Sequence, residues 1–132
     1  MYKTIGAQCY QDERGFIKKV WTKTTDENMD FYSKTIAVGE VFLLYSKPGA
    51  VRGNHDHKET VEYFKVVKGR TTFLLSDVKG DGYEEVELDE SSNDVLIVFP
   101  NTIHSFKNNT NEELIIVVVS SRGYDDKNAD TF

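Results

Sequence analysis

Short runs of strand-forming residues, separated by turn-forming residues, constrain the fold of this chain more than any other feature. The runs are rich in Val, Ile, Phe, Tyr and Thr, and Gly, Asn, Asp and Ser lie between them. No window has the apolar periodicity of a convincing helix, and residues 26–31 could form one helical turn at most. Many short strands at this spacing predict a closed or sandwiched antiparallel β architecture.

The expected strands follow from local composition. The stretch 34–46 is interrupted at Gly39, residues 68–70 read as a tight hairpin turn, and residues 79–82 read as a loop. The polar segment 123–132 is expected to wrap the surface. The whole chain, residues 1–132, is expected to form one domain. The predicted strands are residues 16–21, 34–46, 61–67, 71–76, 85–88, 95–99 and 114–119.

Charge and cysteine content exclude several classes of partner. The formal net charge is −6 and no block of Lys or Arg is present, so a nucleic acid partner is not expected. The longest apolar run, residues 114–119, is too short to span a bilayer, and the start has no signal-peptide pattern. Cys9 is the only cysteine, which fits a reducing, cytoplasmic location.

The first chemical motif contains two closely spaced histidines and a glutamate. Gly49 is followed after five residues by His55 and His57, then after four residues by Glu62, and after six more by Gly69. This spacing resembles the first conserved motif of the cupins at every fixed position. The resemblance implies a small double-stranded β-helix, or jelly-roll barrel.

A second, looser motif follows some forty residues later. His104 and Asn108 match the second cupin motif, whereas Asn93 and Asn101 stand where it has glycines and Phe99 stands in its proline slot. Asparagine is the non-glycine residue that best tolerates left-handed backbone, so the turns are expected to be kept.

These residues form a candidate metal site. His55 and His57 are two residues apart, so on a strand both point to one face, and a hairpin can fold Glu62 back over them. With His104 from the second half of the barrel, the ligand set suits a divalent ion: zinc first, with manganese, iron or nickel as alternatives. The main alternative is a metal-free pocket in which the same residues act as acids, bases and binding groups.

A longer stretch narrows the resemblance to nucleotide-sugar cupins. The run 52–57, Arg-Gly-Asn-His-Asp-His, is similar to the signature of 3,4-ketoisomerases and, more distantly, of 3,5-epimerases acting on such sugars. With Glu62, His104, Asn108 and the ending 130–132, the chain most resembles the C-terminal cupin domain of the capsular polysaccharide enzyme CapF. Position 58 is Lys, where the CapF-like pattern has a third His.

The resemblance implies an isomerase that acts on a 4-keto-6-deoxyhexose linked to dTDP or UDP, in surface polysaccharide or lipopolysaccharide biosynthesis. The expected reaction is proton abstraction beside the ketone and epimerisation at C3. The candidate catalytic residues are His55, His57, Lys65 and Tyr124. The candidate substrate-binding residues are Arg52, Asn54, Tyr45 and Asn108.

Other functions remain open from the sequence. A 3,4-ketoisomerase would move the proton from C3 to C4, a non-catalytic cupin would only bind metal or sugar, and a dioxygenase-type cupin would use the same ligands. If all four ligands hold metal, the base must be another inward residue, and Lys65, Tyr45 and Tyr63 are candidates. A homodimer is expected by analogy, with exchange of N-terminal strands.

Overall fold

The computed structural model describes residues 1–21 and 38–132, and the helical turn considered over residues 26–31 lies outside them. The described residues form strands and no helix, so none offers a helix that could cross a membrane. The strands are β1 (Tyr2–Gly6), β2 (Gln8–Asp12), β3 (Gly15–Lys19), β4 (Glu40–Ser46), β5 (Val51–His55), β6 (Glu62–Lys68), β7 (Arg70–Asp77), β8 (Tyr83–Asp89), β9 (Asp94–Val98), β10 (Thr102–Lys107) and β11 (Leu114–Ser120).

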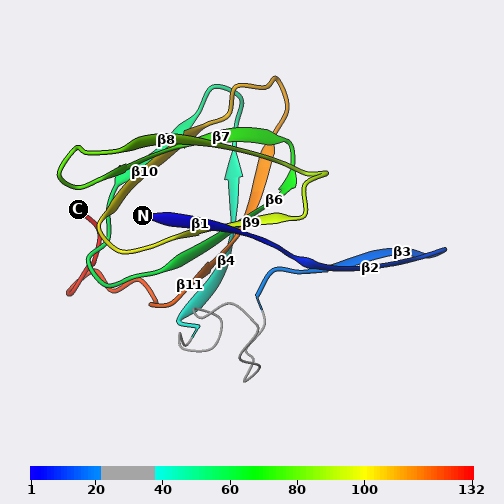
Figure 1. The fold of residues 1–132 in the computed structure, drawn as a ribbon, viewed down its shortest axis with the longest axis horizontal. Helices are drawn as coiled ribbons and strands as arrows, with labels where there is room; N and C mark the ends of the chain where they lie inside the picture. Colours follow the sequence, from blue (N-terminus) through cyan, green and yellow to red (C-terminus); the bar gives the residue numbers. More distant parts are fainter. Residues whose placement is uncertain (22–37) are drawn as a thin grey trace.

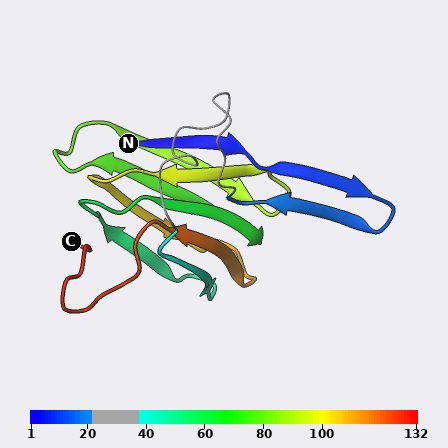
Figure 2. The same ribbon diagram turned by 90° about the horizontal axis from the view of Figure 1, so that it is seen from below.

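Two antiparallel sheets form the body. One has the order β1-β9-β6-β11-β4 and the other has the order β5-β10-β7-β8. The two sheets lie as facing layers, and the β2–β3 hairpin extends from one end of the body, opposite the end where both termini lie (Figures 1 and 2). This arrangement confirms the predicted all-β, jelly-roll architecture.

The core lies between the sheets because side chains alternate along each strand. On β6, Phe64 and Val66 face the core, and Tyr63 belongs to a second cluster on the outer face of the same sheet. The ring centroids of Phe64 and Phe73 are 5.1 Å apart, and those of Phe73 and Phe106 are 4.9 Å apart. This core supports the pocket described below.

The predicted hairpin at residues 68–70 is wrong. β6 pairs with β9 and β11, whereas β7 pairs with β8 and β10, so the connection through Gly69 passes from one sheet to the other. Gly69 has φ +90°, and its carbonyl accepts a hydrogen bond from the Glu90 amide. As a result, Glu62 faces the histidines from the opposite sheet and is not folded back from an adjacent strand.

The two asparagines of the second motif behave differently. Asn101 has φ +62°, as expected for a residue that replaces a turn glycine, and its amide donates to the carbonyl of His57. Asn93 does not adopt positive φ. Only Asn101 of this pair therefore uses the left-handed tolerance of asparagine, immediately before the strand that carries His104.

Candidate functional site

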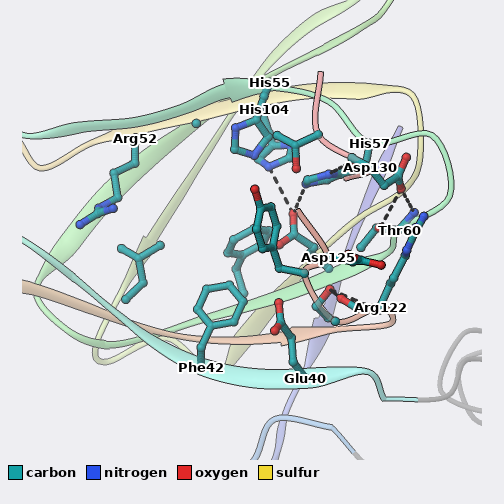
Figure 3. Close-up of a pocket in the computed structure, with 18 of the residues that line it drawn as sticks. Glu40, Phe42, Arg52, His55, His57, Thr60, His104, Arg122, Asp125 and Asp130 are labelled. Atoms are coloured by element: carbon teal, nitrogen blue, oxygen red, sulfur yellow. Dashed lines mark hydrogen bonds and ion pairs between the residues drawn. The ribbon is translucent and has the colours of Figure 1, made fainter. Parts of the chain in front are cut away.

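A cavity of about 450 Å³ opens between the two sheets. Inward-facing residues of β4, β5, β6, β10 and β11 line it, together with the segment that follows β11. Part of the lining is apolar, with Phe42, Leu44 and Phe64 from one sheet and Phe106 from the other. Apart from two glycines, the remaining lining is polar or ionisable, and much of it gathers at the end of the cavity beside the His57–Thr60 segment (Figure 3).

Four potential ligands converge in this cavity. One ligand atom from each of His55, His57, Glu62 and His104 lies within 4.8 Å of all the others. Glu62 Oε1 lies 2.7 Å from His57 Nε2 and 3.4 Å from His104 Nε2. The ring centroids of His55 and His104 are 4.7 Å apart. The four residues predicted as ligands from their spacing thus meet at one point.

Strand pairing aligns two of these histidines. His104 of β10 lies opposite His55 of β5, and the register shifts between His104 and Ser105. Gly53 makes this close pairing possible, because a Cβ at this position would lie only 2.6 Å from the His104 carbonyl oxygen. Gly53 also has φ +88°, a conformation that residues with a Cβ rarely adopt. The glycine of the Arg-Gly-Asn run therefore shapes the geometry of the cluster.

His57 lies beyond the end of β5, which differs from the prediction that both early histidines belong to one strand. Its Nδ1 lies 2.6 Å from the backbone carbonyl oxygen of Asp130, which can only accept, so Nδ1 donates and Nε2 is turned toward Glu62. His104 Nδ1 similarly lies 3.2 Å from the Thr102 carbonyl oxygen. Both rings therefore direct Nε2 into the cluster.

Charge and burial shape the pKa values within the cluster. Burial lowers the pKa of His55, and the neighbouring His104 and His57 lower it further. Burial acts to raise the pKa of Glu62, but hydrogen bonds from His104 and His57 outweigh it and bring the pKa to about 2. For His57, burial acts to lower the pKa, but the bond to Glu62 and the charge of that carboxylate outweigh it and raise the pKa. Glu62 is therefore a carboxylate at neutral pH.

This donor set fits a divalent cation. Three imidazoles and one carboxylate are the ligands that zinc and related ions take, and a tetrahedral ion with bonds of about 2.1 Å needs donors about 3.4 Å apart. The 3.4 Å between Glu62 Oε1 and His104 Nε2 equals that value, whereas the 2.7 Å between Glu62 Oε1 and His57 Nε2 is a direct hydrogen bond that an ion would have to replace. The structure thus contains a potential metal-binding cluster, and the arrangement leaves the cavity side open to a substrate.

Two of the predicted substrate or catalytic residues outside the cluster line the same cavity. Arg52 projects from β5, and its guanidinium donates to Ser46 Oγ at 3.0 Å and to the Tyr45 carbonyl oxygen at 2.9 Å. Tyr124 lies at the mouth and is 71% exposed. The pocket therefore contains a positioned cation and a solvent-exposed phenol in addition to the potential ligands.

The other four predicted residues lie outside the cavity. The Lys65 side chain is buried and donates from Nζ to the carbonyl oxygens of Val66 and Ser92. Asn108 is buried and bonds Ser46, Thr110 and Glu112, which fixes a turn. The remaining two residues outside the lining are Tyr45 and Asn54.

Strand parity explains these corrections for Lys65 and Tyr45. On β6, Glu62 and Phe64 face the cavity, so Lys65 faces the other side of the sheet. On β4, Phe42 and Leu44 face inward, so Tyr45 faces outward. Neither residue is placed to remove a proton from a molecule in the pocket.

Several ionisable residues of the pocket were not among the predicted site residues. They are Glu40, Arg122, Asp125 and Asp130, and Figure 3 shows Glu40 directed into the cavity from β4. Arg122, Asp125 and Asp130 follow β11, and this stretch, which includes most of the segment expected to wrap the surface, closes one side of the cavity. The only sequence signal was the resemblance of the 130–132 ending to nucleotide-sugar cupins.

The sequence of residues 11–132 matches the family described as "Polysaccharide biosynthesis C-terminal domain". The chain belongs to this family. No curated protein is significantly similar in sequence.

Solved structures share the fold of this family member. QdtA, a sugar 3,4-ketoisomerase from Thermoanaerobacterium thermosaccharolyticum crystallised with TDP, has a TM-score of 0.79 at 17% identity, covering 99% of this chain and 86% of QdtA. The dTDP-4-dehydrorhamnose 3,5-epimerase of Bacillus anthracis, with TDP and PPi bound, has a TM-score of 0.80 at 18% identity, covering 98% and 76%. CapF from Staphylococcus aureus has a TM-score of 0.69 at 22% identity, covering 96% of this chain and 33% of CapF. The predicted resemblance to these proteins, CapF included, is confirmed at the level of the fold.

Proposed function

We propose that the protein is a nucleotide-sugar isomerase of surface polysaccharide biosynthesis. It would remove a proton beside the ketone of a 4-keto-6-deoxyhexose and return it to the opposite face, which epimerises C3. The observation that carries this proposal is the convergence of His55, His57, Glu62 and His104 in a cavity large enough for a sugar. Enzymes that share this fold, among them a sugar 3,4-ketoisomerase and a dTDP-4-dehydrorhamnose 3,5-epimerase, support the proposal.

The cluster would hold a divalent ion, with zinc as the first choice and manganese, iron or nickel as alternatives. Such an ion supplies a fixed positive charge that stabilises the enolate formed beside the ketone. The hydrogen bonds from His57 to Asp130 and from His104 to Thr102 would hold the two rings in the orientation that ligation needs.

Arg52 is proposed to bind the diphosphate of a dTDP- or UDP-linked sugar. Two of its N–H groups are used by Ser46 and Tyr45, which fixes the guanidinium and leaves other N–H groups for phosphate oxygens. Figure 3 places Arg52 and Arg122 on opposite sides of the cavity with the histidines between them, so a nucleotide sugar held by its diphosphate at Arg52 would extend its sugar toward the histidines. QdtA and the 3,5-epimerase were both crystallised with TDP.

The proton must be moved by a residue that does not bind the ion. Outside the ligand cluster, the described lining of the cavity includes Glu40, Tyr124 and Asp125, whose side chains can accept or donate a proton. We assign removal of the proton to Glu40, which Figure 3 shows directed into the cavity from β4. We assign return of the proton to Tyr124, which lines the cavity and is largely exposed. In a metal-free enzyme His55 would be the base instead, because burial lowers its pKa and favours the neutral imidazole.

Two other features belong to the proposal. A homodimer is expected, because the β2–β3 hairpin extends from the body and exposes Tyr10, Phe16 and Ile17 by 55%, 62% and 64%. A cytoplasmic location is expected, because Cys9 is the only cysteine of the chain and no disulfide can form within it.

The decisive test is metal analysis followed by chelation. Purified protein is expected to contain about one equivalent of a divalent ion, and to exchange deuterium into C3 of a dTDP-4-keto-6-deoxyhexose in heavy water. Removing the ion is expected to abolish that exchange, and adding it back is expected to restore it. Full exchange after verified metal removal would contradict the metal route and favour His55 as base.

The products separate the remaining candidates. Inversion at C3 defines an epimerase, and a 3-keto product defines a 3,4-ketoisomerase. The 3,4-ketoisomerase is the second candidate, because QdtA has this activity and this fold. Binding of the nucleotide sugar without any deuterium exchange would indicate a non-catalytic cupin. Oxygen consumption with ferrous iron would indicate a dioxygenase.

A further inference from the structure

Asp130 holds the loop that carries His57. Its Oδ2 accepts hydrogen bonds from the Glu59 amide at 2.9 Å, the Thr60 amide at 2.9 Å and the Thr60 hydroxyl at 2.8 Å. Its Oδ1 accepts a bond from the Lys58 amide at 2.9 Å. One carboxylate thus binds three consecutive backbone amides that lie 70 to 72 residues away in sequence.

The same residue also orients the His57 ring through its main chain. The Asp130 carbonyl oxygen lies 2.6 Å from His57 Nδ1, so the ring donates from Nδ1 and presents Nε2 to Glu62. Figure 3 shows His57 between Asp130 and the cluster. Asp130 therefore fixes both the loop and the ring of one potential ligand.

This support matters more for His57 than for the other ligands. His55, Glu62 and His104 lie in strands whose ladders fix their backbones, but His57 lies two residues beyond the end of β5. The backbone of the adjacent Asp56 pairs with Phe132 in both directions, at 3.1 and 3.0 Å. Segment 130–132 therefore supplies the hydrogen-bond partners that a neighbouring strand would give to a residue within a sheet.

We propose that Asp130 is a positioning residue for the metal site, and that the affinity of the cluster for a divalent ion depends on the docking of segment 130–132, which supplies no ligand. This inference deepens the proposed function and depends on the metal site proposed there. Its physical basis is that hydrogen-bond partners of a metal-binding imidazole restrict its orientation before the ion arrives.

The test is a cobalt titration of metal-free protein, followed by visible absorption, which reports both affinity and coordination. In Asp130→Ala, the dissociation constant for Co²⁺ is expected to rise about 10- to 100-fold. The absorption bands at saturating cobalt are expected to shift, because His57 is no longer held in place. Asp130→Asn is expected to recover part of the affinity, since its amide oxygen can still accept bonds from the loop.

Two further variants control for charge and for folding. Asp126→Ala removes the same charge from an exposed position four residues before Asp130, outside segment 130–132, and is expected to bind cobalt as the wild type does. Thr60→Val removes one donor to Asp130 and is expected to weaken cobalt binding by a smaller factor. If Asp130→Ala does not fold, Asp130→Asn and Thr60→Val decide the question.

The outcomes separate this inference from the proposed function. Wild-type affinity and an unchanged spectrum in Asp130→Ala would overturn the positioning role while leaving the metal site in place. Absence of cobalt binding by the wild type would overturn the metal site itself, and the positioning role with it. A lower melting temperature of Asp130→Ala with unchanged cobalt affinity would overturn the positioning role in favour of a structural one.

Discussion

At the scale of single residues, the site combines a rigid ligand cluster with proton-transfer candidates that the cluster leaves free. Glu40 and Tyr124 line the cavity without belonging to the cluster of four ligands. They approach from different elements, since Glu40 begins β4 and Tyr124 follows β11. β4 pairs with β11, with Glu40 opposite Ser120, so the two side chains enter the cavity from neighbouring segments. An epimerase needs one group to remove the proton and another to return it.

Substitutions of Glu40 and Tyr124 are expected to affect different steps, removal of the proton and its return. Glu40→Gln keeps the size of the side chain but cannot accept the proton, so deuterium exchange at C3 should fall by about 100-fold or more. Tyr124→Phe should keep the exchange and slow formation of the inverted product. The measurement is proton NMR of the sugar in heavy water, with metal content checked in each variant. Normal exchange in Glu40→Gln would reassign the base to Asp125 or His55.

Substitution of Lys65 is expected to affect stability and to leave catalysis unchanged, because this residue lies outside the cavity. Lys65→Met should keep kcat within about twofold of the wild type. It should lower the free energy of unfolding by about 1–3 kcal/mol, because the carbonyl oxygens of Val66 and Ser92 lose a charged donor. Turnover assays and urea unfolding measure the two effects. Loss of kcat with unchanged metal content would make Lys65 a candidate base again.

The wild type and Lys65→Met should also differ in how their stability depends on pH. Burial, with repulsion from Lys18, lowers the pKa of Lys65 below the value of 10.5 that the unfolded chain keeps. Between these two pKa values the unfolded chain binds a proton that the folded protein has released, so the stability of the wild type rises with pH relative to Lys65→Met. Urea unfolding of both proteins at several alkaline pH values measures this difference. A constant difference across the range would contradict the lowered pKa.

Site residues could be predicted from the sequence where they belong to a motif with characteristic spacing. His55, His57, Glu62 and His104 could be assigned because their intervals are characteristic, whatever the exact strand register. Lys65 could not be placed, because a shift of one residue in a strand moves every side chain to the other face. Asp130 was missed as a functional residue because hydrogen bonds to a distant loop leave no pattern in the sequence.

At the scale of elements, the approach of β5 to β10 decides whether two ligands meet. His55 and His104 are direct partners in this pairing, and the neighbouring Gly53 lies against the His104 backbone. A side chain at position 53 would lie 2.6 Å from the His104 carbonyl oxygen and 3.0 Å from Ser105 Cα. The strands would have to separate at the bulge.

Gly53→Ala is therefore expected to damage the site as well as stability. Gly80 is a matched control, because it has φ +80° and a methyl group added there would meet open space. Gly80→Ala should cost only the backbone strain, about 1–2 kcal/mol in the free energy of unfolding. Gly53→Ala should cost more and reduce the bound metal, as measured by urea unfolding and by metal analysis. Equal costs and full metal content in both variants would contradict the role of close packing.

The elements themselves were predicted unevenly. The apolar strands β9 and β11 were recognised because they are buried and rich in Val and Ile. The connection between β6 and β7 was misread, because a glycine at positive φ serves a hairpin and a crossing between sheets equally well. β1 and β2 were not predicted, since their short mixed sequences become strands only through pairing with β9 and β3.

At the scale of the whole molecule, the β2–β3 hairpin stands apart from the two packed sheets (Figures 1 and 2). Tyr10 and Ile17 are direct partners across the hairpin, so both side chains share one face. Two-stranded hairpins are marginally stable in isolation. A hairpin that exposes large apolar side chains gains stability if another surface covers them, and a second copy of the chain is the partner expected here.

The double substitution Tyr10→Ser and Ile17→Ser tests this expectation. The wild type should be a dimer by light scattering at micromolar concentration, and the double variant should shift toward monomer because its contact face is no longer apolar. The melting temperature of the body should change little, because neither residue belongs to the core between the sheets. Val78→Ser, which changes another exposed apolar residue in the loop between β7 and β8, should leave the dimer intact. A monomeric wild type would contradict the dimer, and an unaffected double variant would place the interface elsewhere.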